Sequence, residues 1–205
     1  MFEVLTGSGL AASAGLNAYI PLLTMGLLAR YTDLIDLPTG WQWLGNGWVV
    51  AILAVLLTVE VVADKVPVLD HVNDVVQTVV RPTAGGLAFG AGSTSETVTV
   101  SDPGSFFSSN DWVPVVAGVL IALGVHLLKS AARPVINATT AGFGAPVAST
   151  AEDAASIVMS LVAIILPVLV LAFLFGLVAF TVWFLRRRRD RRRERQAARA
   201  AGYRV

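Results

Sequence analysis

The feature that most limits the fold is a long apolar stretch near the C-terminus. Residues 156–185 contain no charged side chain, and four arginines, Arg186 to Arg189, follow directly. A helix needs about 20 apolar residues to cross the bilayer core, which is about 30 Å thick. This stretch exceeds that length, so we expect it to cross with a tilt or a kink. The chain is therefore predicted to be an integral membrane protein.

Composition supports this class and predicts an orientation. Hydrophobic residues make up 55% of the 205 residues and charged residues 14%, whereas soluble domains average about 25% charged residues. Ten of the 15 Lys and Arg residues follow Leu185. Because basic residues concentrate on the cytoplasmic side of a membrane, residues 186–205 are predicted to be a cytoplasmic tail. We expect this tail to contact anionic lipid rather than nucleic acid.

Three further apolar segments are predicted to form helices in the membrane, namely 9–29, 48–63 and 112–128. The expected fold is an all-α, multi-pass bundle of about four spans over residues 1–185, in the plasma (inner) membrane. An even number of spans places the N-terminus in the cytoplasm with the tail. Three spans, or a re-entrant first segment, are the alternatives.

Small residues line one face of the first predicted span. Gly7, Ala11 and Gly15 recur at a spacing of four, which allows another helix to approach closely. A bundle of so few helices rarely encloses a pore, so we expect a homo-oligomer. Asn17 and Pro21 follow; Asn17 is a polar group at membrane depth, and Pro21 interrupts the helical hydrogen bonds.

Residues 69–81 have the pattern of an amphipathic helix. At 100° per residue, Asp70, Asp74, Gln77 and Arg81 fall within about 60° of one another. One alternative is a helix that lies flat on the membrane surface. Surface helices favour Lys and Arg over anionic lipid, however, and this face is mainly acidic. The pattern therefore favours a polar face turned inward, with Arg81 paired to Asp74 or to the second half of the chain.

Two short Gly/Ala-rich runs, 82–92 and 134–148, are predicted to be re-entrant or interfacial segments. Each follows an Arg-Pro pair, which suggests a repeat with units 48–92 and 112–148. Two such units would be inverted, with the short runs entering from opposite faces, as in many transporters. Chance matches among abundant Ala and Gly residues are the alternative.

The region around residues 59–88 carries a longer motif: Glu60-x-x-x-Asp64-Lys65-x-Pro67-x-x-Asp70-x-x-x-Asp74-x-x-x-Thr78-x-x-Arg81-Pro82-x-x-Gly85. This motif resembles that of a bacterial membrane family catalogued as domain of unknown function 4126. The earlier Ser13-Ala14-Gly15-Leu16-Asn17-Ala18-Tyr19 is similar to its N-terminal motif. The resemblance covers most of residues 5–175. It implies a membrane protein and no particular activity.

Ionisable residues inside a membrane cost about 2.5–3.5 kcal/mol or more at a helix centre, so they are candidates for function. The predicted transport path or polar site consists of Glu60, Asp64, Asp70, Asp74, Thr78 and Arg81. Secondary candidates are Asn17, His126, Arg133 and Asn137. Alternatively, the acidic group lies at the water interface, Asn17 joins helices, and His126 is an ordinary hydrogen-bonded histidine.

The sequence favours a small transporter or channel for an ion or small polar solute. A non-transporting membrane scaffold is the alternative, and a metal-dependent lipid-modifying enzyme is a third. The chain has no cysteine, which excludes thiolate chemistry. Because no catalytic motif is present, we expect no enzyme activity, no catalytic residue, no cofactor and no metal.

Overall fold

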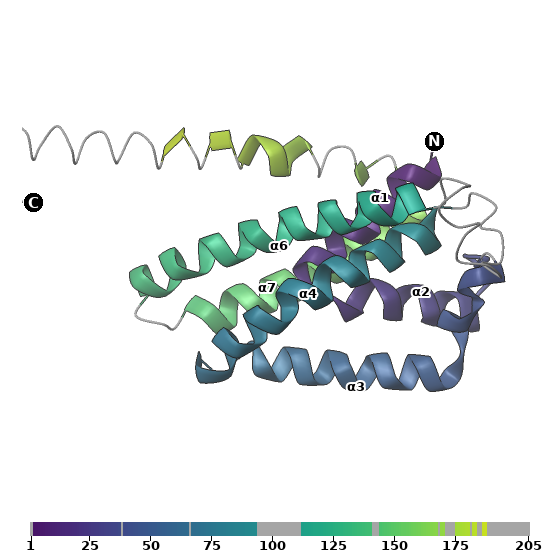
Figure 1. The fold of residues 1–205 in the computed structure, drawn as a ribbon, viewed down its shortest axis with the longest axis horizontal. Helices are drawn as coiled ribbons and strands as arrows, with labels where there is room; N and C mark the ends of the chain where they lie inside the picture. The colour runs from purple at the N-terminus through teal and green to yellow at the C-terminus, as the bar shows by residue number, and fades with distance from the viewer. Residues whose placement is uncertain are drawn as a thin grey trace, which may run out of the picture. The chain divides into compact units, whose positions relative to one another are not determined.

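A computed structural model describes most of the chain, namely residues 2–37, 39–65, 67–93, 112–140, 144–167, 169–170, 175–180, 182–183 and 186–187. These residues are helical or lie in connections, and none of them forms a strand. The chain divides into two units, residues 1–170 and 171–205. The first unit contains α1 (Phe2–Leu16), α2 (Tyr19–Tyr31), the short 3-10 helix η1 (Thr39–Gly45), α3 (Gly47–Ala63), α4 (Pro67–Gly92), α6 (Trp112–Thr140) and α7 (Gly144–Ile165) (Figure 1).

The first predicted span is broken into α1 and α2. The Asn17 side-chain oxygen accepts hydrogen bonds from the backbone N–H groups of Tyr19 at 3.1 Å and Ile20 at 3.2 Å. These amides would bond within the helix if it continued. Pro21 has no N–H and fits the first turn of the new helix. The prediction of one continuous helix over 9–29 was wrong, because a single asparagine ends α1 and caps α2.

α2 then returns to the end of the bundle where α1 begins (Figure 1). Gly7 of α1 lies against Phe89, near the end of α4. Gly26 of α2 lies against Leu44 and Val50, at the start of α3. Because α3 starts and α4 ends at the same end of the bundle, α1 and α2 form a hairpin whose tip lies inside it. The re-entrant first segment, the alternative that the sequence left open, stays a prediction.

α4 is one helix of 26 residues that continues through Pro82. The prediction that 82–92 is a separate short segment was therefore wrong. Proline removes only one N–H from the helix, and tight packing on α6 offsets this loss. Gly85 is in contact with Ala122 and with the backbone oxygen of Gly118, so α4 and α6 approach closely.

α6 likewise continues through Pro134 to Thr140, past the predicted end of the span at 128. The second Gly/Ala run is therefore the end of α6 and the start of α7, with 141–143 outside the described residues. The predicted inverted repeat loses the two separate runs from which it was inferred. The loop that would join its two units, 94–111, is also outside the described residues.

The longest apolar stretch is not one helix. α7 begins at Gly144, ends at Ile165 and is followed by a turn at Leu166–Pro167. The predicted span over 156–185, with its tilt or kink, was wrong at its start, and a turn at Leu166–Pro167 interrupts it; several residues of its second half, 171–174 among them, lie outside the described residues. Proline ends the helix, and the helix starts early enough to include Glu152 and Asp153. Glu152 and Asp153 therefore lie within α7, although the sequence predicted a helix that begins only at residue 156.

The small-residue face of α1 packs inside the chain. A Cβ atom added at Gly15 would lie 2.6 Å from the Ala122 backbone oxygen, and Ala11 is fully buried. This close contact places α1 against α6. The homo-oligomer stays a prediction, but the small-residue face of α1 is occupied by α6 and cannot be its contact surface.

Two described helices, α6 and α7, are long and apolar enough to cross a membrane. The number rises to three if η1 and α3, which meet at an angle of 62°, form one bent span. The predicted span over 48–63 corresponds to α3. These helices suggest a membrane location.

The described part of the second unit is helical and carries aromatic and basic side chains. The rings of Phe180 and Trp183 are 5.9 Å apart, and the Arg187 guanidinium lies 5.0 Å from the centre of the Trp183 ring. A cation over an indole face is a favourable contact. Most of the predicted tail lies outside the described residues, so its contact with anionic lipid stays a prediction.

Candidate polar site

The polar face of α4 turns into the bundle. Gln77 is 2% exposed and Arg81 is completely buried, whereas Val75 and Val79 are 72% and 70% exposed. A helix on a water-soluble protein would show the opposite arrangement. The inward orientation that the acidic face favoured is therefore confirmed for these residues.

Six charged side chains gather where the inward face of α4 meets α3, α6 and α7. The carboxylates are two residues from the end of α3 and one from α7, and the cations come from α4 and α6. Five of the six side chains are at most 5% exposed. We call this group the charge cluster: Glu60, Asp64, Arg81, Lys129, Arg133 and Glu152.

Asp64 is the centre of the charge cluster. Its Oδ2 atom lies 3.2 Å from Arg133 Nη2, 3.4 Å from Lys129 Nζ and 3.7 Å from Arg81 Nη2. The Asn73 amide donates to Oδ1 at 2.6 Å. Asp64 follows the last residue of α3, outside the candidate spans. Burial acts to raise the pKa of Asp64, but the three surrounding cations outweigh it and hold that pKa below its ordinary value of 3.8.

Arg81 connects Glu60 to a histidine on α6. Arg81 Nη2 donates to Glu60 Oε1 at 2.8 Å, and its Nη1 lies 3.2 Å from His126 Nδ1. Arginine can only donate, so His126 Nδ1 accepts and carries no proton. His126 is therefore neutral with its proton on Nε2, which donates to Thr78 Oγ1 at 3.1 Å. The sequence candidates Thr78 and His126 thus belong to one hydrogen-bonded chain with Arg81.

The charge cluster reaches the surface of the bundle at Glu152. Its carboxylate lies 2.8 Å from Lys129 Nζ and 3.4 Å from Arg133 Nη2, and its side chain is 19% exposed. Ser149, one turn earlier on α7, donates to Asp64 Oδ2 at 3.3 Å. The charges therefore extend from a partly exposed carboxylate to Glu60, which is buried.

The tip of the α1–α2 hairpin lies against the charge cluster. Lys129 Nζ donates to the Leu16 backbone oxygen at 3.1 Å, at the C-terminal end of α1. The Asn17 amide donates to Asp153 Oδ1 at 2.9 Å while its oxygen caps α2. At the break between α1 and α2, the Leu16 carbonyl therefore faces the Lys129 cation, and the Asn17 amide faces the Asp153 carboxylate.

A model of the family described as "Domain of unknown function (DUF4126)" matches residues 4–187. The match covers most of the chain and includes every residue of the charge cluster. This chain belongs to the DUF4126 family. The resemblance seen in the sequence motif is confirmed. No curated protein and no solved structure matches the chain.

In this DUF4126 chain, the structure brings together seven of the sequence candidates: Glu60, Asp64, Thr78, Arg81, His126, Arg133 and, at the edge, Asn17. The side chains of Asp70, Asp74 and Asn137 lie outside the part that the structure describes.

Sequence reasoning missed three residues, Lys129, Glu152 and Asp153. Lys129 and Arg133 are four residues apart, a spacing that places two cations on one helix face and could have indicated an acidic partner. Glu152 and Asp153 precede the span predicted to begin at residue 156, so they were not considered as site residues.

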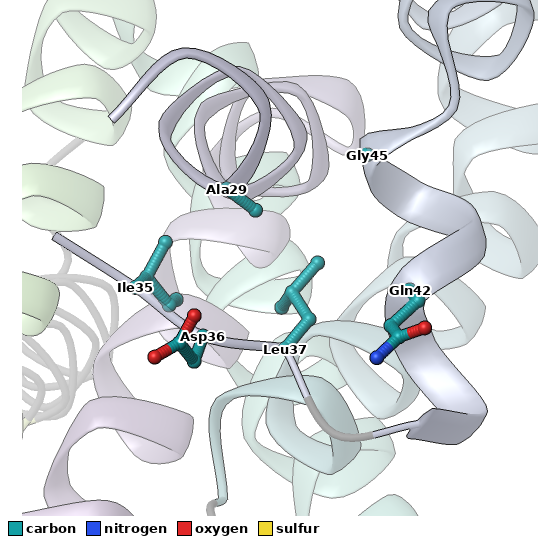
Figure 2. A pocket seen from close by; sticks show the side chains of 6 residues that line it. All are labelled: Ala29, Ile35, Asp36, Leu37, Gln42 and Gly45. Atoms are coloured by element: carbon teal, nitrogen blue, oxygen red, sulfur yellow. The ribbon is translucent and has the colours of Figure 1, made fainter. Parts of the chain in front are cut away.

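A separate open pocket of about 300 Å³ is lined by the end of α2, the α2–η1 connection and η1. Figure 2 shows the Asp36 carboxylate and the Gln42 amide on opposite sides of Leu37. Asp36 is the one ionisable residue among those lining it. The pocket is at the opposite end of the bundle from the α3–α4 connection, so it does not form part of the charge cluster.

Proposed function

We propose that this DUF4126 chain is a small transporter or channel for an ion or a small polar solute, with the charge cluster as its polar site. The observation that carries the proposal is the burial of five of the six side chains of the charge cluster inside a bundle whose outer faces are apolar. Each buried charge costs several kcal/mol unless it is paired. Intramembrane charges of this kind mark ion and substrate pathways.

The broken helix supports the same proposal. Non-helical backbone at membrane depth is tolerated only where protein buries it or where it lines a water-filled cavity. Transporters commonly place the ends of half-helices at their binding sites. Here the α1 carbonyl end at Leu16 and the α2 cap at Asn17 both contact charged side chains.

The alternative functions have less support. A scaffold would be favoured by an α4 helix that lies flat on the membrane, yet Gln77 and Arg81 are buried. The metal-enzyme hypothesis needs carboxylates free of cations, whereas Asp64 faces three cationic side chains that would repel Mg²⁺ or Ca²⁺. Among the described residues, no three His, Asp or Glu side chains are placed to hold a metal ion.

Solute jumps on proteoliposomes test the proposal. The purified full chain is reconstituted and adsorbed on a solid-supported membrane, and currents are recorded on jumps of pH, Na⁺, K⁺, chloride and a panel of small zwitterions. We expect a current for at least one probe, abolished by Asp64→Asn and kept by Asp33→Asn, which changes an exposed carboxylate in the α2–η1 connection. A current that survives Asp64→Asn, or no current for any probe, would contradict the proposal.

A further inference from the structure

Glu152 is the most exposed member of the charge cluster. Its side chain is 19% exposed, whereas the two cations that it contacts, Lys129 and Arg133, are 1% and 5% exposed. Both cations come from α6, one helical turn apart, and both approach the same carboxylate oxygen, Glu152 Oε2. Glu152 therefore covers two buried cations from the surface of the bundle.

Fewer contacts hold Glu152 than hold the other carboxylate that meets these cations. Asp64 accepts hydrogen bonds from Asn73 and Ser149 in addition to its three ion pairs, and its side chain is 1% exposed. Among the described residues, the Glu152 carboxylate is held by the two cations of α6 alone. A glutamate at the surface of a helix can turn toward water by changing its side-chain rotamer, with the backbone in place. Glu152 is therefore the carboxylate whose departure disturbs the fewest contacts.

The charges of the cluster match while Glu152 is in place. Within this described group, the carboxylates of Glu60, Asp64 and Glu152 face three cations. When Glu152 turns outward, two carboxylates remain for the same three cations, and the lost pairs are those of Lys129 and Arg133. A buried charge that loses its partner is strongly unfavourable. The outward position of Glu152 is therefore favoured when another anion takes its place.

We propose that Lys129 and Arg133 form a binding site for a small carboxylate anion, and that Glu152 is an exchangeable lid that fills the site with its own carboxylate. Glu152 Oε2 lies 2.8 Å from Lys129 Nζ and 3.4 Å from Arg133 Nη2, and this position marks where an oxygen of the solute binds. Ammonium and guanidinium groups donate hydrogen bonds and cannot accept them, so the site is complementary to an oxyanion. A cationic solute would have to replace one of the two buried cations instead.

The same two cations connect this site to the rest of the charge cluster. Both also pair with Asp64 Oδ2, at 3.4 Å from Lys129 Nζ and 3.2 Å from Arg133 Nη2. Lys129 Nζ donates in addition to the Leu16 backbone oxygen, at the break between α1 and α2. As a step in transport, this inference rests on the function proposed above, for which it names the solute class. As a binding site, it requires no transport.

Rescue of Glu152→Ala by acetate tests the site. The purified full chain is unfolded thermally in detergent, in sodium acetate and in sodium chloride of equal ionic strength. The substitution removes the carboxylate from the two cations and opens space for acetate. Because a ligand stabilises the state that it binds, acetate should raise the unfolding temperature of Glu152→Ala by about 2–4 °C more than that of the parent. The parent measures the general effect of acetate on protein stability.

Two further variants show where acetate binds. Asp33→Ala removes an exposed carboxylate from the α2–η1 connection and should respond to acetate as the parent does. Glu152→Ala combined with Lys129→Met should lose the extra response, because two carboxylates of the cluster then face two cations. An equal response in Glu152→Ala and Asp33→Ala, or a response that persists in the double variant, would overturn the proposal.

Glu152→Gln decides the matter if Glu152→Ala does not fold. It keeps the side-chain volume and removes the charge, and its amide must turn outward before acetate binds. We therefore expect a smaller rise of the same sign, and no rise would overturn the anion site. The rescue and the transport currents fail separately. Rescue without currents supports the anion site and contradicts transport, and currents without rescue do the reverse.

Discussion

Asp64 Oδ2 and Arg133 Nη2 meet at 3.2 Å inside the bundle, although Arg133 lies 69 residues later in the chain. The pair joins the connection between α3 and α4 to the C-terminal half of α6. Both side chains are almost completely buried, so water screens their attraction little. The relative position of these helices therefore depends on charge pairs as well as on apolar packing.

Replacing Asp64 with asparagine should destabilise the fold strongly. The variant leaves three cations around a neutral side chain, and breaking a buried pair in this way costs about 3–5 kcal/mol. Thermal unfolding in detergent measures the loss. Asp33→Asn, which changes an exposed carboxylate, is the control and should unfold close to the parent temperature. Equal midpoints for the two variants would show that the Asp64 pairs contribute nothing.

Lowering the pH should remove the same stabilisation. The pKa of Asp64 in the folded chain lies below its ordinary value of 3.8, so its contribution is fully present above that value. The contribution is lost as the pH falls through the lower folded-state pKa. The gap in unfolding temperature between the parent and Asp64→Asn should therefore stay constant near neutral pH and close below 3.8. If the difference in unfolding temperature widened in acid, the pH dependence would have the opposite sign, and the ion pairs of Asp64 could not be its cause.

Two asparagine caps should differ in their contribution to stability. Asn46 only caps α3, through a hydrogen bond to Trp48 N–H, so Asn46→Ala should cost about 1 kcal/mol. Asn17 caps α2 and also donates to Asp153, so Asn17→Ala should cost about 2 to 3 kcal/mol. The two midpoints of thermal unfolding give the comparison. An Asn17 variant no less stable than the Asn46 variant would mean that the bond to α7 is unimportant.

Two glycines on α6 provide a test of the close contact with α4. A Cβ added at Gly118 would collide with the Gly85 backbone oxygen and lie 2.5 Å from Phe89 Cβ, whereas nothing lies within 4 Å of one at Gly124. Gly118→Ala should cost about 1–3 kcal/mol through overpacking. Gly124→Ala should gain up to about 1 kcal/mol from helix propensity. If both variants gain stability, α4 and α6 do not pack as closely as the structure has them.

The sequence predicted the inward face of α4 because charge and periodicity are local properties. An acidic stripe opposite valines is visible within residues 69–81, and it indicates burial once a membrane is expected. The same reasoning found Glu60, Asp64 and Arg81 for the polar site. Their partners on α6 and α7 were harder to find, because nothing local says that Asp64 will meet a residue as distant as Arg133.

The helix boundaries failed where tertiary packing or one side chain decided them. Pro82 and Pro134 were expected to end helices, yet α4 and α6 each continue through their proline. Asn17 was treated as a group joining helices, and its capping of α2 could not be inferred from propensity. The early start of α7 was also missed, and Glu152 was missed with it.

Cysteine accessibility is the most direct test that the charge cluster lies on an aqueous path. The chain has no cysteine, so Ser149→Cys and Val79→Cys each introduce a single thiol. Ser149 is buried beside Asp64, and Val79 is 70% exposed on the apolar outer face. A membrane-impermeant maleimide is applied to intact cells and to inside-out vesicles. We expect Ser149→Cys to be labelled and Val79→Cys to stay unlabelled, because the charge cluster opens to water while Val79 faces lipid. Labelling of Val79→Cys with none of Ser149→Cys would contradict it, since α4 would then lie at a water surface over a sealed cluster.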